Sequence, residues 1–319
     1  MFAMLIKKDK NLSWEQVPDP TIRKGEALIN VKAAGVNRAD ILQLKGLYLP
    51  PEGASKILGL ELSGEIVEIK SSEWEIGDRV MVLVTGGAYA TEAVVPIDML
   101  LPIPSNFSFE EAATIPEAIY TSYLNLVVEG KLQKGETVLI HSGAGGVGST
   151  AIQLAKSLGA TVIATCGSEE KIKFCKSVGA DVVVNYKEVN LENKLKEIHP
   201  EGYDLVFDTI GGEYTNLHVN LLKTNGRWIL IGLLGGIEAK IDFSKFLTKN
   251  ILLKSSTLRN KPLSFKVNLT NQIKKNILPL YNTGKIRPVV DKIYPIEKAE
   301  EAHKFMEENR VKGKIVLKI

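Results

Sequence analysis

One glycine-rich run limits what this chain can fold into more than any other feature: Gly143-Ala144-Gly145-Gly146-Val147-Gly148. The apolar residues 138–141 before it predict a buried strand, and residues 149–158 after it predict an amphipathic helix that Gly159 ends. A glycine turn that joins a strand to a helix in this way is typical of an α/β fold with a parallel sheet.

The alternation of strand and helix continues after this turn. Further strands are predicted over residues 161–166, 181–186, 203–208, 227–232 and 251–257, with a helix over 169–178 and other helical stretches between. Such a series requires right-handed crossovers and a parallel sheet covered by helices on both faces. The middle of the chain is therefore predicted to be a doubly wound α/β domain.

The glycine turn suits the binding of a dinucleotide. Gly143 permits the tight turn, Gly145 lets a pyrophosphate approach the backbone, and Gly148 lets the helix pack closely on the strand. The helix N-terminus then offers free N–H groups and a partial positive charge to the anion. The pattern alone is a weak signal, but the strand before it and the helix after it favour a dinucleotide site over an ordinary tight turn.

The residues after the second strand of this series favour NADPH over NADH. An NAD site needs an acidic residue about 20 positions beyond the glycine turn, where it binds the ribose hydroxyls. Here the strand ends in Cys166-Gly167-Ser168, without a carboxylate. Lys171 follows in the first turn of a helix, where the helix dipole disfavours a cation, and a 2′-phosphate would give it a partner. The alternative is a solvated lysine beside Glu169 and Glu170.

The segments on either side have another pattern. Residues 25–29, 64–67 and 77–82 are short apolar strands broken by glycines, which is typical of an antiparallel, barrel-like domain. Near the end of the chain, residues 269–281 predict a helix and residues 315–317 predict a strand that completes this first domain. The β-rich domain is thus expected to be discontinuous in sequence.

Composition and charge exclude several classes of partner. With 40 Lys and Arg against 37 Asp and Glu, the net charge of +3 is too small to favour nucleic acid or an anionic membrane. The longest apolar run, residues 228–237, contains three glycines and is too short to span a bilayer. Two cysteines make no disulfide framework, and the first ten residues lack the order of a signal peptide. We expect a cytoplasmic protein without nucleic-acid or membrane partners.

Several motifs together resemble one family. They are Ala33-Ala34-Gly35-Val36-Asn37-Arg38-Ala39-Asp40, Gly46-Leu47-Tyr48, Pro50-Pro51-Glu52-Gly53-Ala54-Ser55, Gly59-Leu60-Glu61-Leu62-Ser63-Gly64, Ile115-Pro116-Glu117-Ala118 with Thr121, residues 141–148, and Gly313-Lys314-Ile315-Val316-Leu317. Over its whole length the chain is similar to the zinc-free quinone oxidoreductase (zeta-crystallin-like) family of the medium-chain dehydrogenase/reductase superfamily, and most to its stress-inducible quinone oxidoreductase subgroup.

The resemblance implies a particular domain organisation. A Rossmann nucleotide domain that binds NADPH is inserted in a discontinuous, β-rich, GroES-like substrate domain, and the active site lies in the cleft between them. The expected ranges are 1–117 for the substrate domain, 118–258 for the Rossmann domain, and 259–319 for the return to the substrate domain.

The resemblance also bears on the question of a metal. Zinc-dependent relatives have a cysteine where this chain has Asn37 and a histidine where it has Leu60, so only Glu61 remains as a zinc ligand. The four histidines are scattered in the sequence, and both cysteines lie in the nucleotide domain: His141, His199, His218, His303, Cys166 and Cys175. We therefore expect no metal.

An enzyme without a metal suits an acceptor that is already electron-poor. A bound metal would lower the pKa of an alcohol or polarise a carbonyl. A quinone or an enone needs less help, because hydride adds to its conjugated system and the resulting anion needs only a hydrogen-bond donor or solvent. The protein then acts mainly by holding cofactor and acceptor face to face.

The resemblance assigns roles to individual residues. Asn37 and Tyr48 are implied to lie near the nicotinamide and the quinone, with Tyr48 as a donor to the acceptor oxygen, and Thr121 on the nicotinamide side. For Tyr48 the alternative is a loop tyrosine packed on Pro50 and Pro51. The cofactor contacts implied are Tyr48, the glycine turn 143–148, Gly167, Ser168, Lys171, Tyr186, Gly232, Leu233, Leu234, Thr257, Leu258, Arg259 and Lys314.

Two of these cofactor residues have alternative interpretations. Tyr186 could instead be the apolar end of a buried strand. Lys314, which is followed by a β-run, could simply be exposed to solvent.

Three functions remain open at this stage. The first is an NADPH:quinone reductase, and the second is an NADPH-dependent reductase of enals, enones or enoyl thioesters. The third is a cofactor-binding sensor or RNA-binding protein with residual reductase activity, which the near-neutral charge disfavours. Residues 251–257 would end the parallel sheet with an unpaired edge, so we also expect a homodimer that covers this edge.

Overall fold

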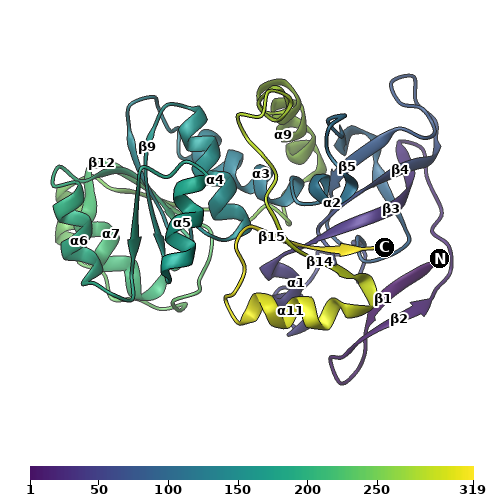
Figure 1. The fold of residues 1–319 in the computed structure, drawn as a ribbon, viewed down its shortest axis with the longest axis horizontal. Helices are drawn as coiled ribbons and strands as arrows, with labels where there is room; N and C mark the ends of the chain where they lie inside the picture. Colours follow the sequence, from purple (N-terminus) through teal and green to yellow (C-terminus); the bar gives the residue numbers. More distant parts are fainter. The chain divides into compact units, whose positions relative to one another are not determined.

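The computed structural model describes all residues from 1 to 319 (Figure 1). The chain divides into two compact units. Unit 1 comprises residues 1–120 and 258–319, and unit 2 comprises residues 121–257. No helix is both long enough and apolar enough to cross a bilayer.

Unit 2 contains a six-stranded parallel sheet with helices between the strands (Figure 1). The strand order is β10-β9-β8-β11-β12-β13, and every neighbouring pair is parallel. The bounds are β8 Thr137–Ile140, β9 Thr161–Cys166, β10 Val182–Asn185, β11 Tyr203–Asp208, β12 Leu222–Leu230 and β13 Leu252–Ser255. Because the order reverses between β8 and β11, the sheet is doubly wound, which confirms the predicted α/β fold class.

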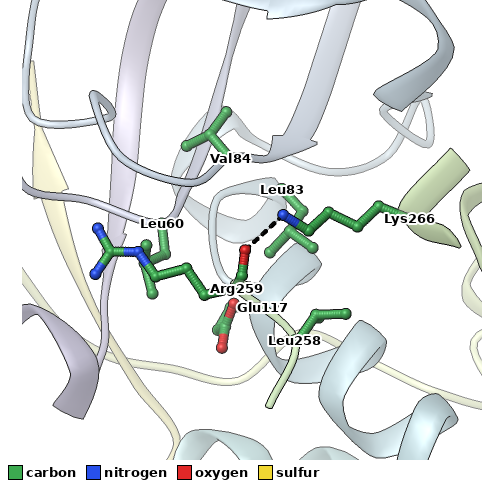
Figure 2. A pocket seen from close by; sticks show the side chains of 7 residues that line it. All are labelled: Leu60, Leu83, Val84, Glu117, Leu258, Arg259 and Lys266. Atoms are coloured by element: carbon green, nitrogen blue, oxygen red, sulfur yellow. Dashed lines mark hydrogen bonds between the residues drawn. The ribbon is translucent and has the colours of Figure 1, made fainter. Parts of the chain in front are cut away.

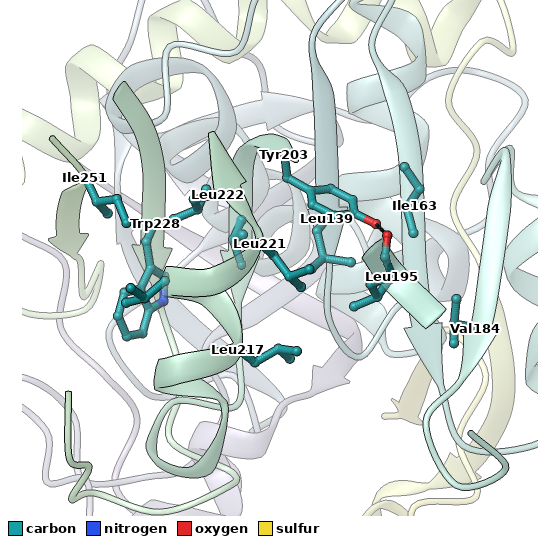
Figure 3. Packing of buried hydrophobic residues seen from close by; sticks show 12 residues of the cluster. Leu139, Ile163, Val184, Leu195, Tyr203, Leu217, Leu221, Leu222, Trp228 and Ile251 are labelled. Atoms are coloured by element: carbon teal, nitrogen blue, oxygen red, sulfur yellow. Dashed lines mark hydrogen bonds between the residues drawn. The ribbon is translucent and has the colours of Figure 1, made fainter. Parts of the chain in front are cut away.

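The helices of unit 2 follow the strands in alternation. They are the π-helix Leu124–Glu129, α4 Gly146–Ser157, α5 Glu169–Ser177, α6 Leu191–Ile198, the 3-10 turn Gly212–Tyr214, α7 Thr215–Leu221 and α8 Phe243–Thr248. Figure 3 shows apolar side chains between strands and helices, among them Leu139 of β8, Leu195 of α6 and Trp228 of β12. The phenol of Tyr203 lies in this core and donates a hydrogen bond of 2.9 Å to the carbonyl oxygen of Leu195. The central strands β8, β9 and β11 are buried along most of their length, as expected for a parallel sheet that helices cover on both faces.

Unit 1 is rich in β-structure. One sheet has the order β14-β15-β3-β4-β5-β7, with β6 also paired to β3, and β1 and β2 form a separate hairpin. The bounds are β1 Phe2–Ile6, β2 Leu12–Gln16, β3 Glu26–Val36, β4 Glu61–Ile69, β5 Arg79–Leu83, β6 Glu92–Pro96, β7 Leu100–Pro102, β14 Val290–Pro295 and β15 Lys314–Lys318. β15 pairs with β3, so the end of the chain completes the sheet of its beginning.

Two features of unit 1 differ from the sequence-based expectation. β14 and β15 are parallel, whereas an antiparallel domain was predicted, because α11 (Ala299–Glu307) forms a crossover between them. The single helix expected over 269–281 starts earlier and is broken into α9 (Leu263–Asn276) and α10 (Leu278–Asn282). Pro279 lies in the first turn of α10, where its missing N–H costs nothing, and it could not continue α9.

The remaining helices are short. They are the 3-10 turns Ile97–Met99 and Ile296–Lys298, α1 Arg38–Leu44, α2 Phe109–Ala112 and α3 Pro116–Tyr123, the last of which crosses the boundary between the units. Asn37 is the N-cap residue of α1, and its backbone N–H donates a hydrogen bond of 2.7 Å to the Asp40 carboxylate in the third position of the helix.

Candidate functional site

The glycine turn of unit 2 is shaped by close backbone packing. Gly145 caps the N-terminus of α4, and no side chain caps this helix, so its first N–H groups are open to a ligand. A Cβ on Gly148 would lie 2.2 Å from the carbonyl oxygen of Ser142, and one on Gly143 would lie 2.9 Å from Cβ of Ala164. Gly145 would meet nothing closer than 3.4 Å. The turn therefore fits an anion such as a dinucleotide pyrophosphate.

A second set of candidate cofactor-binding residues lies at the carboxyl ends of β9 and β10. A Cβ on Gly167 would lie 2.7 Å from the hydroxyl oxygen of Tyr186, so this phenol occupies the space that glycine leaves. Ser168 caps α5, and its Oγ accepts a hydrogen bond of 3.3 Å from the backbone N–H of Lys171. Tyr186 is 41% exposed, so its alternative interpretation as a buried strand end is wrong.

Gly232, Leu233 and Leu234 follow β12 at the same edge of the parallel sheet. A Cβ on Gly232 would lie 2.8 Å from the carbonyl oxygen of Thr209, and the two leucines are exposed. Thr257 follows β13 and is also exposed. Carboxyl ends of parallel strands share one edge, so this edge gathers the glycine turn, residues 167–171, Tyr186 and residues 232–234.

Buried histidines in unit 2 form a network that sequence reasoning missed. His141 Nε2 lies 2.9 Å from His218 Nε2, and His141 Nδ1 lies 2.9 Å from Thr165 Oγ1. His218 Nδ1 lies 3.5 Å from Asp208, which accepts a hydrogen bond of 2.8 Å from the Trp228 indole. Burial lowers the pKa of both histidines to about 3, so both are neutral near pH 7. The expectation that the histidines are scattered is wrong for this pair, which lies 77 residues apart in sequence.

A buried ionic cluster in unit 1 joins Asn37, Glu61 and Lys314. The Lys314 ammonium forms an ion pair with Glu61 and donates a hydrogen bond of 2.6 Å to Oδ1 of Asn37. Nδ2 of Asn37 donates to Glu61 at 2.8 Å, and the backbone N–H of Glu117 donates to the other Glu61 oxygen at 2.8 Å. Lys314 is only 4% exposed, so its alternative interpretation as a surface lysine is wrong.

Asp40 extends this cluster and was not recognised from the sequence. Its carboxylate accepts hydrogen bonds from the backbone N–H groups of Asn37 (2.7 Å) and Gly59 (3.1 Å) and from the Tyr89 phenol (3.2 Å). The Tyr89 oxygen also lies 3.2 Å from Nε2 of His303. Burial raises the pKa of Asp40 to about 6. The conspicuous run 33–40 contained Asp40, but no sequence signal pointed to Tyr89 or His303.

Tyr48 of unit 1 lies in a loop that Arg259 holds. The Arg259 guanidinium lies 5.4 Å from the centre of the Tyr48 ring and donates to the Tyr48 carbonyl oxygen at 3.2 Å. It also donates to Gln43 Oε1 at 2.6 Å and to the Thr85 carbonyl oxygen at 2.9 Å. Burial raises the pKa of the half-buried Tyr48 phenol, so it keeps its proton near neutral pH. Arg259, predicted as a cofactor contact, is 5% exposed and is occupied by these partners.

A small pocket in unit 1 lies beside Arg259. Figure 2 shows the charged side chains of Glu117, Arg259 and Lys266 among the apolar ones that line this pocket. Nζ of Lys266 donates a hydrogen bond of 2.7 Å to the Arg259 carbonyl oxygen. The apolar lining is Leu60, Leu83, Val84 and Leu258. Thr121, by contrast, lies on α3 in unit 2, where its carbonyl oxygen accepts a hydrogen bond of 2.8 Å from Asn125.

Known proteins resemble this chain over most of its length. Residues 146–274 match the zinc-binding dehydrogenase family, and residues 23–105 match the alcohol dehydrogenase GroES-like domain. A human synaptic vesicle membrane protein VAT-1 homolog is 33% identical over 93% of this chain and 80% of its own. Mouse prostaglandin reductase-3 is 32% identical, over 95% and 83%. A probable quinone oxidoreductase of Leishmania amazonensis is 32% identical, over 87% and 82%.

Solved structures share the whole fold. Escherichia coli quinone oxidoreductase complexed with NADPH has a TM-score of 0.88 at 26% identity and covers 100% of this chain and 99% of its own. The JamJ enoyl reductase has a TM-score of 0.87 at 29% identity and covers 99% and 98%. The chain belongs to the medium-chain dehydrogenase/reductase superfamily, among quinone oxidoreductase-like relatives. It is an oxidoreductase, and its family was predicted correctly from the sequence.

The name of the first matching family implies zinc, but the residues of this chain do not fit a zinc site. Catalytic zinc usually takes three protein ligands from Cys, His, Asp and Glu. Asn37 and Leu60 offer no thiolate or imidazole, and Glu61 is already engaged by the Lys314 ammonium. No group of three or more His, Cys, Asp or Glu side chains is arranged to hold a metal ion.

Proposed function

We propose that this oxidoreductase is an NADPH-dependent quinone reductase that works without a metal. The observation that carries the proposal is the ion pair between Lys314 and Glu61. Glu61 is the only residue that could still serve as a zinc ligand at the positions used by zinc-dependent relatives, and this ion pair engages its carboxylate. Without a Lewis acid, an electron-poor acceptor such as a quinone suits the site best. The bound nicotinamide would supply the hydride.

The preference for NADPH is supported by the residues beyond β9. Gly167, Ser168, Lys171 and Tyr186 lie together there, and the strand ends in Cys166 without a carboxylate. A 2′-phosphate would accept hydrogen bonds from the lysine and the phenol. The solved quinone oxidoreductase in complex with NADPH is consistent with this choice.

For the acceptor we propose the Tyr48 phenol as hydrogen-bond donor. The raised pKa of this phenol keeps its proton in place, and Arg259 fixes the backbone of its loop. Both polar atoms of the Asn37 side chain are already bonded within the ionic cluster, so we propose that Asn37 acts by positioning. Thr121, residues 232–234 and 257–259, and Lys314 remain proposed cofactor contacts.

A second candidate is the reduction of a conjugated carbon–carbon double bond in an enal, enone or enoyl thioester. Mouse prostaglandin reductase-3 and the JamJ enoyl reductase are both similar to this chain, and their names favour this candidate. The exposed Leu47 and Leu49 on either side of Tyr48 would suit an apolar substrate of either kind.

One assay separates these candidates. We would measure NADPH oxidation with 9,10-phenanthrenequinone, benzoquinone and 2-hexenal in parallel, with and without a chelator. A quinone reductase gives the highest kcat/KM with a quinone, and chelation leaves it unchanged. A higher kcat/KM with 2-hexenal would favour the second candidate, and activity lost on chelation and restored by zinc would contradict the metal-free site.

We also propose that the protein works as a homodimer in the cytoplasm. β13 is the edge strand of the unit 2 sheet, and its Leu252 and Leu253 are 51% and 42% exposed. Native proteins cover apolar sheet edges, and a two-fold pairing of β13 with its copy would do so.

A further inference from the structure

Asp208 is a fully buried carboxylate at the carboxyl end of β11. Its Oδ1 accepts hydrogen bonds from the backbone N–H groups of Ile210 (2.7 Å) and Gly211 (3.0 Å). Its Oδ2 accepts a hydrogen bond of 2.8 Å from the indole of Trp228, which belongs to the apolar core of unit 2 (Figure 3). The carboxylate therefore fixes the loop 209–212 to the core of the sheet.

The loop 209–212 packs closely against residues 232–235, which follow β12. The backbone N–H groups at positions 234 and 235 donate hydrogen bonds of 3.2 and 2.7 Å to the carbonyl oxygens at positions 209 and 210. A Cβ on Gly211, where φ is +66°, would lie 2.9 Å from Cδ2 of Leu233, so a side chain here would push the two segments apart. The position of the loop therefore sets the position of residues 232–234, which are proposed cofactor contacts.

The same loop is bonded to the glycine turn. Oγ1 of Thr209 and Oγ of Ser142 lie 2.8 Å apart, which is a hydrogen bond between the two hydroxyls. Ser142 directly precedes the glycine turn, and its carbonyl oxygen accepts a hydrogen bond of 2.9 Å from the backbone N–H of Gly145. The loop 209–212 thus joins the two segments proposed to hold the dinucleotide, the glycine turn and residues 232–234.

Two buried histidines make a second connection between Asp208 and the glycine turn. His141 directly precedes Ser142 in sequence, and its Nε2 lies 2.9 Å from Nε2 of His218. Nδ1 of His218 lies 3.5 Å from the Asp208 carboxylate and makes no shorter hydrogen bond. Nδ1 of His141 lies 2.9 Å from Oγ1 of Thr165 on β9. Asp208, His218, His141 and Thr165 therefore form one chain of polar contacts below the glycine turn.

The charge of Asp208 sets the direction of this chain. A neutral imidazole has one donor and one acceptor nitrogen, and both histidines are neutral near pH 7 because burial lowers the pKa of each to about 3. An ionised carboxylate only accepts, so the His218 proton belongs on Nδ1, where it faces Asp208. Nε2 of His218 then accepts from Nε2–H of His141, and Nδ1 of His141 accepts from the Thr165 hydroxyl. The opposite arrangement would place a lone pair of His218 against the carboxylate.

We propose that Asp208, His218 and His141 are positioning residues for NADPH, which hold the glycine turn and residues 232–234 at the spacing that the dinucleotide needs. This statement rests on the proposed function. All three side chains are fully buried, so they act through the backbone that they hold and not by touching the cofactor. Their hydrogen bonds, more than their volume, carry this role.

The test compares two substitutions of His218 that remove different properties. His218→Phe keeps an aromatic ring for the edge contacts with Trp228 and Tyr214 but removes the partner of His141 Nε2. His218→Gln loses the ring but keeps a polar group that can bond to His141. By fluorescence titration, we expect the Kd of NADPH to rise about tenfold in His218→Phe and to stay within about twofold of the parent in His218→Gln.

Two further readouts separate positioning from a purely structural role. Thermal unfolding shows whether each variant folds, and a side chain that only filled the core would make NADPH affinity follow thermal stability. The KM of the quinone at saturating NADPH should stay as in the parent, because the network lies in unit 2 and Tyr48 lies in unit 1. A folded His218→Phe variant that binds NADPH as the parent does would overturn the proposal.

A substitution in the loop keeps the test decisive if His218→Phe does not fold. Thr209→Val preserves the shape of the side chain but removes the hydroxyl that bonds to Ser142, so the Kd of NADPH should rise several-fold. Thr161→Val, at the exposed amino end of β9, is the matched control. Equal Kd values for these two variants would overturn the proposal.

NMR of protein labelled with ¹⁵N-histidine reads the direction of the chain. We expect His218 as the Nδ1–H tautomer and His141 as the Nε2–H tautomer, and the opposite pair of tautomers would overturn the role assigned to the Asp208 charge. A parent protein that binds no NADPH would overturn the proposed function and this inference with it. A parent that binds NADPH, with a His218→Phe variant that binds it equally well, would overturn this inference alone.

Discussion

Arg259 contacts both the aromatic ring and the backbone of Tyr48 and so holds the loop that carries this residue. The guanidinium lies 5.4 Å from the ring centre and donates to the Tyr48 carbonyl oxygen, and its other donors bond to Gln43 and Thr85. A buried guanidinium with this many acceptors fixes the position of the phenol that we propose as the donor to the acceptor oxygen.

Tyr48→Phe should lower kcat more than it raises KM. A donor to the oxygen that becomes negative stabilises the transition state more than the ground state. We expect a loss of about 10- to 100-fold, larger for an enone than for a reactive quinone, which needs little stabilisation. Steady-state kinetics with both acceptors measure this, with Tyr294→Phe as a control in the same unit. Unchanged kcat for both acceptors would mean that Tyr48 only shapes the pocket.

Arg259→Lys should destabilise the protein and weaken catalysis together. A lysine cannot reach Gln43, the Tyr48 carbonyl and the Thr85 carbonyl at the same time, so buried acceptors lose their donor. We expect the free energy of unfolding to fall by about 1–3 kcal/mol. Urea denaturation measures this, and the exposed Arg287→Lys is the control. A variant as stable as the parent would show that these hydrogen bonds are replaced by water.

Lys171→Ala should remove most of the preference for NADPH. One charge-assisted contact to a 2′-phosphate contributes about 1.5–3 kcal/mol, so the parent should bind NADPH at least about tenfold more tightly than NADH. Fluorescence titration of both cofactors measures this difference, and Lys173→Ala on the same helix is the control. Equal affinities in the parent protein would contradict the assignment.

His303 should make the protein less stable in mild acid. Burial lowers its pKa from 6.5 to about 4, although the charge of Glu307 opposes this. Between these pH values the unfolded chain binds a proton that the folded chain does not, so the stability present above pH 6.5 is lost as pH falls toward 4. Relative to His303→Gln, the parent should lose about 1.4 kcal/mol per pH unit in this window.

The measurement for His303 is urea denaturation at several pH values. The Gln side chain keeps a hydrogen-bonding group near the Tyr89 phenol, and His199→Gln at a partly exposed position is the control. Parallel pH profiles of the parent and His303→Gln would show that His303 does not titrate in this range.

The homodimer is tested by light scattering. Two chains of 35.0 kDa should give twice that mass at micromolar concentration. Leu253→Lys on the exposed side of β13 should shift the mass toward the monomer, because a buried charge opposes the pairing of two apolar edges. A parent protein that scatters as a single chain would contradict the dimer.

Much of unit 2 could be predicted from the sequence because its signals are local. Residues 161–166 and 203–208 were predicted as strands with the bounds that β9 and β11 have. The glycine turn combines strand, turn and helix within a few residues, and steric contacts between neighbouring segments require glycine at 143 and 148. Local periodicity and local sterics need no knowledge of the rest of the chain.

Only the tertiary structure decided which distant polar groups meet. Lys314 meets Asn37 across 277 positions, and His141 meets His218 across 77. From the sequence, Lys314 could be either a cofactor contact or a surface lysine, and the histidines were expected to be scattered. The reason is that the polarity of a side chain does not show which distant residue it will contact. A buried charge must be paired, but its partner is chosen by the sheet registers that bring β15 beside β3 and β3 beside β4. The sequence gives the identity of each residue, but only the pairing of strands that are distant in sequence brings these residues together in one site.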